Sequence, residues 1–228
     1  MTGIKLGIDE AGKGPVIGPM CIAGVCLDAE QEKKLKILGV NDSKKMAPKK
    51  RTFFDATIKK YATAWYVHEI DAKQIDDMRK IMTMNEIAVL CFSKVMEEMT
   101  AAIDLKDDIE MFTIAYLDAA DIFEDRFGRR VKTEYSKKYA DKAAEIEFIS
   151  KHKADVNNPI VSSASIIAKH RRDSLIEEIK KEEGVDFGSG YPSDPYTRRF
   201  LEKYAKEHGE FPDYVRKSWK TAEDALSL

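Results

Sequence analysis

The feature that most constrains this chain is a short apolar segment that ends in two adjacent acidic residues. Residues 4–8 have the composition of a buried strand, and Asp9 and Glu10 follow it directly. A loop with three glycines and two prolines, residues 12–19, comes next. Glycine lets a backbone approach a ligand closely, and buried carboxylates are unfavourable unless a positive charge compensates them. The segment therefore predicts a divalent cation at the strand end, beside a loop that contacts a ligand.

The composition is that of a globular protein. The 228 residues are 43% hydrophobic and 34% charged, with a net charge of −2, which neither requires nor excludes a nucleic-acid partner. The sequence has no apolar segment of membrane-spanning length and no signal peptide, so we expect a soluble cytoplasmic protein that does not bind membranes. Cys21, Cys26 and Cys91 lack metal-ligand spacing, and we interpret them as reduced core thiols.

Hydrophobic periodicity and turn residues predict a mixed sheet flanked by helices. We expect the first two strands to be antiparallel, and the loop at residues 188–195 to mark a boundary between 1–187 and 188–228. The predicted strands are 4–8, 20–27, 62–70, 112–118 and 145–150, and the predicted helices are 30–38, 48–61, 84–103, a helix from 121, 159–183, 196–207 and a short C-terminal helix with Trp219.

Carboxylates occur at the ends of three predicted strands. Asp9 and Glu10 follow the first, Asp118 ends the fourth, and Asp155 comes shortly after the fifth. In open α/β sheets such strand ends gather around one crevice, where four negative charges repel one another strongly. Two Mg²⁺ or Mn²⁺ ions reverse that balance, and the absence of Cys/His pairs argues against zinc. This pattern predicts a two-ion site for attack on a phosphodiester.

Each acidic or basic residue also has a structural interpretation. Most single aspartates at strand ends are caps or turn residues, and we assign Asp121, with Glu124 three residues later, to a helix-capping box. We interpret His152 and His170 as structural, since bound metal ions can activate water without them. A phosphate-binding P-loop is rejected, because Lys13 is followed by glycine in place of Ser or Thr.

Seven segments in a fixed order carry a resemblance to a known family. They are 7–19, 42–45, 116–121, 151–155, 159–169, 188–195 and 216–221. With these segments the chain resembles the type 2 ribonucleases H, ribonuclease HII in its archaeal form, over nearly its whole length. The resemblance implies a ribonuclease H-like catalytic domain at 1–187 and a small helical lobe at 188–228 that lines the substrate cleft.

The resemblance also implies the reaction. The family cleaves the RNA strand of RNA–DNA hybrids, and single ribonucleotides embedded in duplex DNA, by two-metal-ion hydrolysis that leaves 5′-phosphate and 3′-hydroxyl ends. Its metal-binding and catalytic acids fall on Asp9, Glu10, Asp118 and Asp155.

Substrate-binding residues are implied in the same way. A glycine-basic-glycine element reads the ribose 2′-hydroxyl through its backbone, a tyrosine stacks on the sugar at the DNA side, and two lysines contact phosphates. These residues are Gly12, Lys13, Gly14, Tyr191, Lys44 and Lys45.

The chain departs from the family pattern at two places. The family usually has Arg where this chain has Lys13, and a lysine cannot form a two-pronged phosphate contact. The tail at 225–228 lacks the Gln-plus-paired-aromatics motif by which some relatives bind the sliding clamp, which argues against that partner. On family grounds we expect a monomer.

Two alternatives remain from the residues alone. One is a nuclease or strand-transfer enzyme of the same fold that acts on DNA and does not need a 2′-hydroxyl. The other is a non-enzymatic hybrid-binding protein whose acids hold a structural ion, in which case chelation would unfold the chain.

Overall fold

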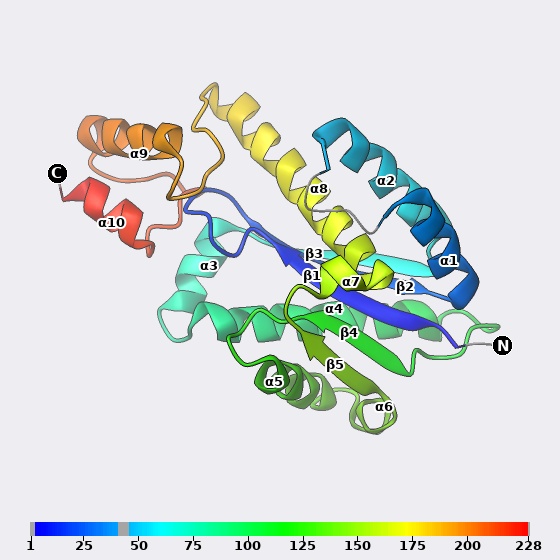
Figure 1. Ribbon diagram of the computed structural model, residues 1–228. Coiled ribbons are helices and arrows are strands. Elements are labelled where there is room, and N and C mark those ends of the chain that lie inside the picture. The colour runs from blue at the N-terminus through cyan, green and yellow to red at the C-terminus, as the bar shows by residue number, and fades with distance from the viewer. Residues whose placement is uncertain (1–2, 41–45, 228) are drawn as a thin grey trace. The chain divides into compact units, whose positions relative to one another are not determined.

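The structure is a computed structural model that describes residues 3–40 and 46–227 (Figure 1). The chain forms two compact units, and each is built from separate segments of the sequence. The first unit is Met1–Ala11, Ile22–His68 and Ala88–His170, and the second is Gly12–Cys21, Glu69–Ile87 and Arg171–Leu228. The predicted lobe at 188–228 lies within the second unit, and its boundary at residue 188 stays a prediction.

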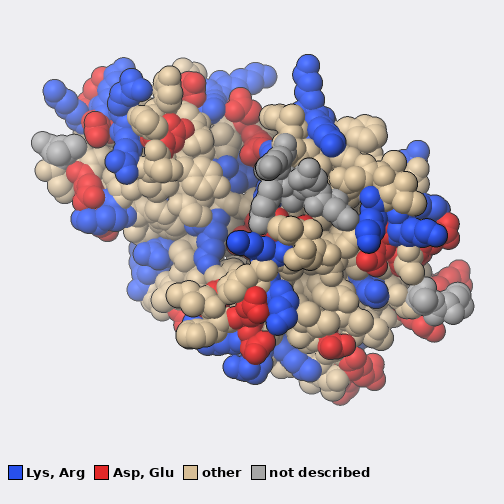
Figure 2. Space-filling view, viewed as in Figure 1, with Lys and Arg blue, Asp and Glu red and all other residues tan. Residues whose placement is uncertain are grey.

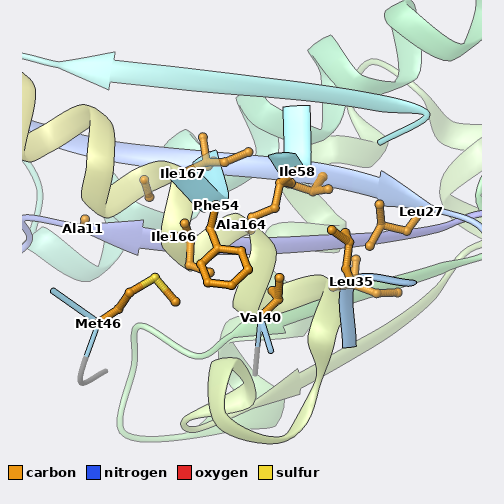
Figure 3. Packing of buried hydrophobic residues seen from close by; sticks show 14 residues of the cluster. Ala11, Leu27, Leu35, Val40, Met46, Phe54, Ile58, Ala164, Ile166 and Ile167 are labelled. Atoms are coloured by element: carbon orange, nitrogen blue, oxygen red, sulfur yellow. The ribbon is translucent and has the colours of Figure 1, made fainter. Parts of the chain in front are cut away.

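A five-stranded mixed sheet forms the centre of the first unit, as the sequence predicted. Its strand order is β3-β2-β1-β4-β5. β1 pairs in parallel with β4, and β4 pairs in parallel with β5, whereas β2 runs opposite to β1 (Figure 3). The strands are β1 Lys5–Ala11, β2 Met20–Leu27, β3 Ala64–Ile70, β4 Ile114–Asp118 and β5 Glu147–Lys151.

Helices cover both faces of this sheet (Figure 1). Helices α1, α2 and α8 pack on one face, and α4 and α5 pack on the other. Their bounds, with those of two short helices, are α1 Ala29–Leu38, α2 Pro48–Tyr61, α4 Met84–Asp104, α5 Glu124–Ser136, α6 Ala140–Glu145, α7 Ala154–Asn157 and α8 Pro159–Glu183.

The two faces have separate apolar cores. On the first face Leu27 packs with Phe54 and Ile167 in a buried cluster drawn from β2, α2 and α8 (Figure 3). On the other face Phe92 of α4 and Phe127 of α5 meet edge to face, with ring centroids 5.0 Å apart. Burial of this apolar area is the main source of stability and fixes β1 between two layers of helices.

The second unit has its own core, to which the C-terminal part of α8 contributes with two of three further helices, α9 and α10. Val16 and Ile17 of the glycine-rich loop are buried with Phe187, Leu201 and Phe211. A β-bridge joins Ile17 to Val215, so the loop after β1 is held by the C-terminal part of the chain. The helices are α3 Ala72–Arg79, α9 Pro195–His208 and α10 Lys220–Leu226.

Most of the predicted elements are confirmed, including α2 and α8 with their predicted bounds, but one assignment was wrong. α5 begins at Glu124 with Phe123 at its N-cap position, so Asp121 does not cap it. Asp121 instead accepts two hydrogen bonds from the Arg126 guanidinium, at 2.8 and 2.6 Å. The carboxylate also accepts the backbone amides of Ile122 and Phe123, so it holds the loop before α5 and is not the N-cap of the helix. Helices α3, α6 and α7 were not predicted.

The cysteine prediction is confirmed, since all three thiols are free and buried. Burial raises the pKa of Cys21 and of Cys91 to about 12, so both thiols are protonated at neutral pH.

Within residues 3–40 and 46–227, no helix combines the length and apolar character that a membrane span needs.

Gly7 tests how closely α8 packs on β1. A Cβ at this position would lie 2.7 Å from the Ile160 carbonyl carbon, which cannot move without moving α8. We expect Gly7→Ala to lower the free energy of unfolding by about 1–3 kcal/mol, the cost of overpacking a core. Chemical denaturation measures this, with Gly3→Ala as the control because a Cβ there meets nothing within 4 Å. Equal stability of the two variants would contradict the close packing.

Candidate active site

Three of the four predicted acids come from the carboxyl ends of two neighbouring strands. The register of β1 and β4 ends with Ile8 opposite Leu117. Asp9 and Asp118 each follow one residue later on these parallel strands, and Glu10 comes next on β1. Asp9 is only 3% exposed. The sheet therefore brings a buried carboxylate and two partly buried ones to one edge.

The electrostatics of Asp9 show the consequence. Burial raises the pKa of this carboxyl well above its usual range, and repulsion from Glu10 and then from Asp118 raises it further. A hydrogen bond from Ser165 and the charge of Lys169 act in the opposite direction. The edge therefore carries more negative charge than its own side chains neutralise, which favours binding of a cation.

Asp118 and Asp155 are connected through the turn that follows β5. The Ala154 amide donates to Asp118 Oδ1 at 2.9 Å, at the start of α7. Lys153 has a φ of 55°, a left-handed conformation that reverses the chain and starts this helix. The turn buries Asp155, which is 2% exposed.

Lys169 of α8 contacts Asp155 directly and Asp9 through Ser165. Its ammonium lies 3.6 Å from Asp155 Oδ2 and donates to Ser165 Oγ at 2.6 Å. Ser165 in turn bonds Asp9. The sequence analysis did not place Lys169 or Ser165 among the site residues. Their spacing of four residues on a predicted helix next to Asp155 was the available signal.

The donor set fits Mg²⁺ or Mn²⁺, because every predicted ligand is a carboxylate and hard cations prefer oxygen. Asp9, Glu10 and Asp118 interact electrostatically, and Asp155 shares Lys169 with Asp9. Among the described residues, no three His, Cys, Asp or Glu side chains lie close enough together, as they stand, to hold a metal ion. The ammonium of Lys169 supplies part of the positive charge that a cation would bring.

In the second unit, a single buried arginine holds the glycine-rich loop. The Arg216 side chain is fully buried and donates to three backbone carbonyls. Its Nη2 lies 2.6 Å from Gly12 O, Nη1 lies 3.0 Å from Lys13 O, and Nε lies 3.0 Å from Gly18 O. Burial, with a smaller contribution from Arg172, lowers the pKa of Arg216 to about 9, so it is still charged at neutral pH.

These bonds decide which way the loop's amides point. In a trans peptide the carbonyl and the following N–H point in opposite directions, and the described residues contain no cis peptide. Because the carbonyls of Gly12 and Lys13 point to Arg216, the N–H groups of Lys13 and Gly14 point away from it. Trp219 Nε1 donates to Gly14 O at 3.1 Å and fixes the next carbonyl. The sequence analysis placed Arg216 and Trp219 in the family segment 216–221 but gave neither residue a role at the site.

The Lys13 side chain points to its own unit. Its Nζ donates to Asn85 Oδ1 at 2.8 Å, at the start of α4. The Lys13 amide can therefore face a ligand, while its side chain is held by Asn85. The sequence analysis did not identify Asn85.

Tyr191 lies on the loop before α9 and is 41% exposed. The Arg172 guanidinium lies 5.3 Å from the centroid of its ring, and Arg172 itself is 6% exposed. The same loop accepts the Val16 amide at Gly190 O, at 2.8 Å, so Tyr191 and the Gly12–Gly14 loop belong to one framework. Lys44 and Lys45 lie outside the described residues.

The two histidines have structural contacts. The His152 ring nitrogen Nε2 lies 3.0 Å from Ile122 O, and the His152 amide donates to Glu124 Oε1 at 2.6 Å. His170 Nε2 lies 3.7 Å from Asp55 Oδ2. These contacts agree with the structural interpretation of both residues.

Comparison with known proteins identifies the family. The family model described as "Ribonuclease HII" matches residues 6–222. The chain is 58% identical over 219 residues to the ribonuclease HII of Methanosarcina barkeri, covering 96% of this chain and 93% of that protein.

Solved structures agree. The ribonuclease H2 of Pyrococcus horikoshii OT3 superposes with a TM-score of 0.81 and 37% identity, over 98% of this chain and 97% of that one. The ribonuclease HII in a complex with PCNA from Archaeoglobus fulgidus gives a TM-score of 0.79 and 36% identity, over 95% of each chain. The sheet and its flanking helices are thus those of a known architecture, and the chain belongs to the ribonuclease HII family.

Proposed function

We propose that this chain cleaves the RNA strand of RNA–DNA hybrids, and single ribonucleotides embedded in duplex DNA, by hydrolysis with two divalent ions. As a member of the ribonuclease HII family it is an endoribonuclease that acts on RNA–DNA hybrids. The single-ribonucleotide substrate, the 5′-phosphate and 3′-hydroxyl products and the roles of individual residues are our proposal. The observation that carries it is the concentration of negative charge around buried Asp9.

The four acids would hold the ions. Asp9, Glu10 and Asp118 would offer carboxylate oxygens from the edge of the sheet, and Asp155 would do so from α7. Bound Mg²⁺ or Mn²⁺ would supply an activated water and would neutralise charge at the cleaved phosphate. The chain's own part is to hold these oxygens in place. Ser165 orients Asp9 by a hydrogen bond, and Lys169 balances Asp155 with its charge.

The loop at Gly12–Gly14 would recognise the ribose. The 2′-hydroxyl is the group that distinguishes RNA from DNA, and it can accept hydrogen bonds from amides that point outward. The bonds from Arg216 turn the amides of Lys13 and Gly14 outward before any substrate arrives. Tyr191 would stack on the neighbouring sugar, with its ring fixed by Arg172.

Attraction of the phosphate backbone would depend on local cations. Figure 2 shows Lys and Arg interspersed with Asp and Glu over the visible face, in keeping with a net charge of −2. We assign Lys44 and Lys45 to such contacts on the resemblance alone. The Archaeoglobus fulgidus relative was solved in a complex with PCNA, and residues 225–228 of this chain lack the Gln-plus-paired-aromatics motif.

The function is tested with two duplexes that differ by one 2′-hydroxyl. We expect cleavage of the duplex with a single ribonucleotide and of a long hybrid, in Mg²⁺ and in Mn²⁺, and none of the all-DNA duplex.

Asp118→Asn should lower kcat by at least about 10³-fold, because it removes a metal ligand, and should leave hybrid binding within a few-fold. Cleavage of the all-DNA duplex would favour the DNA nuclease, and absence of any cleavage would favour the binding protein.

Asp9→Asn tests the excess charge. Because burial and repulsion raise the pKa of Asp9 in the folded chain, its ionised form destabilises the fold above that pKa, and protonation relieves this as the pH falls. In EDTA at neutral pH we expect Asp9→Asn to raise the Tm by about 2–4 °C, the shift that about 1 kcal/mol gives in a chain of this size.

The same variant should lose the metal response. Mn²⁺ should stabilise the native chain against heat and should stabilise Asp9→Asn far less, since binding to the folded state is what raises the Tm. The native response should weaken as the pH falls and Asp9 takes up a proton. An Mn²⁺ response equal in both proteins would remove Asp9 from the ion site.

Arg216→Lys tests whether Arg216 orients the loop at Gly12–Gly14 for recognition of the ribose. A lysine cannot donate to the carbonyls of Gly12, Lys13 and Gly18 together, so the amides lose their fixed direction. We expect kcat/KM on the single-ribonucleotide duplex to fall about 10²-fold, in line with the loss of bonds to a charged donor, with the Mn²⁺ thermal shift retained. The matched control is Arg198→Lys, which alters an exposed arginine that donates to Pro192 O. Equal losses in both variants would contradict the role of Arg216.

A further inference from the structure

Two adjacent large apolar side chains point into solvent just after the proposed catalytic Asp118. Ile122 is 81% exposed and Phe123 is 60% exposed, and both lie in the loop between β4 and α5. Single exposed apolar residues are common, but water contact with two large neighbours in sequence is unfavourable. A pair held in a fixed position beside a reaction centre indicates a surface that is covered when a ligand binds.

The loop is braced so that this pair cannot turn inward. The Asp121 carboxylate is buried, accepts both nitrogens of the Arg126 fork, and also receives the backbone amides of Ile122 and Phe123. The Arg126 guanidinium lies 4.6 Å from the centroid of the Phe123 ring, and His152 Nε2 contacts Ile122 O at 3.0 Å. The loop is therefore ordered before binding, which lowers the entropy cost of using it as a contact.

The neighbours of the loop belong to the proposed active site. The Ala119 amide donates to Lys151 O at 3.0 Å, and the His152 amide donates to Glu124 Oε1. The loop thus runs beside the turn that leads to Asp155. Lys151 and Lys153 beside this loop are exposed and can meet phosphates, although Lys151 Nζ also lies 3.3 Å from Glu124 Oε2. An exposed apolar pair with lysines nearby matches a nucleic-acid duplex, in which apolar sugar and base edges lie between rows of phosphates.

We propose that Ile122 and Phe123 contact the minor groove of the substrate duplex beside the cleaved phosphodiester. This inference rests on the proposed function. Hybrids with RNA have A-like geometry with a wide, shallow minor groove, which gives apolar side chains access to sugars and base edges. A protein partner fits less well, because a stable protein interface needs about 20–30 residues a side and this apolar surface is two residues with lysines nearby.

The test is the double variant Ile122→Ser with Phe123→Ser on the long RNA–DNA hybrid. We expect KM to rise about tenfold, because the apolar area of two side chains is no longer buried against the minor groove, with kcat within about twofold. The slope of log KM against log salt should not change, because no phosphate contact is removed. The variant loses the contact between the Phe123 ring and Arg126 but keeps both bonds from Arg126 to Asp121, so we expect the loop to stay ordered and the Tm to change by no more than a few degrees. Phe123→Tyr, which keeps the ring, should retain the native KM.

Leu105→Ser is the matched control. Leu105 is 86% exposed in the same unit, but it precedes β4, whereas Ile122 and Phe123 follow it. Its KM should stay native. If the native chain cleaves the duplex and the double variant has the same KM as Leu105→Ser, this inference is wrong and the proposed function stands. A changed salt slope would also overturn it. If the native chain itself fails to cleave, the proposed function fails first.

Discussion

Repulsion among carboxylates at the end of β1 is the interaction on which the rest of the site depends. The sheet register forces Asp9 and Asp118 onto neighbouring strand ends, and the helices on both faces keep Asp9 out of water. Neither charge can move away without breaking the core. The chain compensates in part with Ser165 and Lys169, which lie one turn apart on α8. The negative potential that remains can be relieved by a divalent cation. The same repulsion that favours cation binding therefore lowers the stability of the metal-free fold.

The covalent chain then connects chemistry with recognition. One residue separates Glu10 from Gly12, so the proposed ligands and the proposed ribose-reading loop are consecutive in sequence. The loop keeps its form because Arg216, from near the other end of the chain, binds three of its carbonyls. Burying this guanidinium is costly, as the lowered pKa of Arg216 indicates. Because the buried guanidinium fixes the direction of the backbone, the loop offers its amide groups to a ligand. Backbone amides are present whatever side chain a residue carries.

The sequence predicted best those elements whose local residue pattern agrees with their place in the fold. The apolar segment before Asp9 predicted β1, and Pro159 marked the start of α8, because strand composition and an N-terminal proline are local signals. It was wrong at Asp121, where a capping-box spacing competes with the Arg126 fork, which the spacing does not reveal. The role of Arg216 could not be predicted, since its partners lie about 200 positions away and are backbone atoms that any sequence provides.

The departure at Lys13 also has a physical explanation in this arrangement. A family arginine at this position could reach a phosphate with a two-pronged contact, and a lysine cannot replace it in that role. Here, however, the ammonium is bound by Asn85, while the carbonyl and the following amide are oriented by Arg216. If the backbone carries recognition, replacing arginine by lysine changes the charge distribution near the loop and leaves the direction of its amides intact. Selectivity for ribose would then depend more on Arg216 than on the side chain that the family motif emphasises.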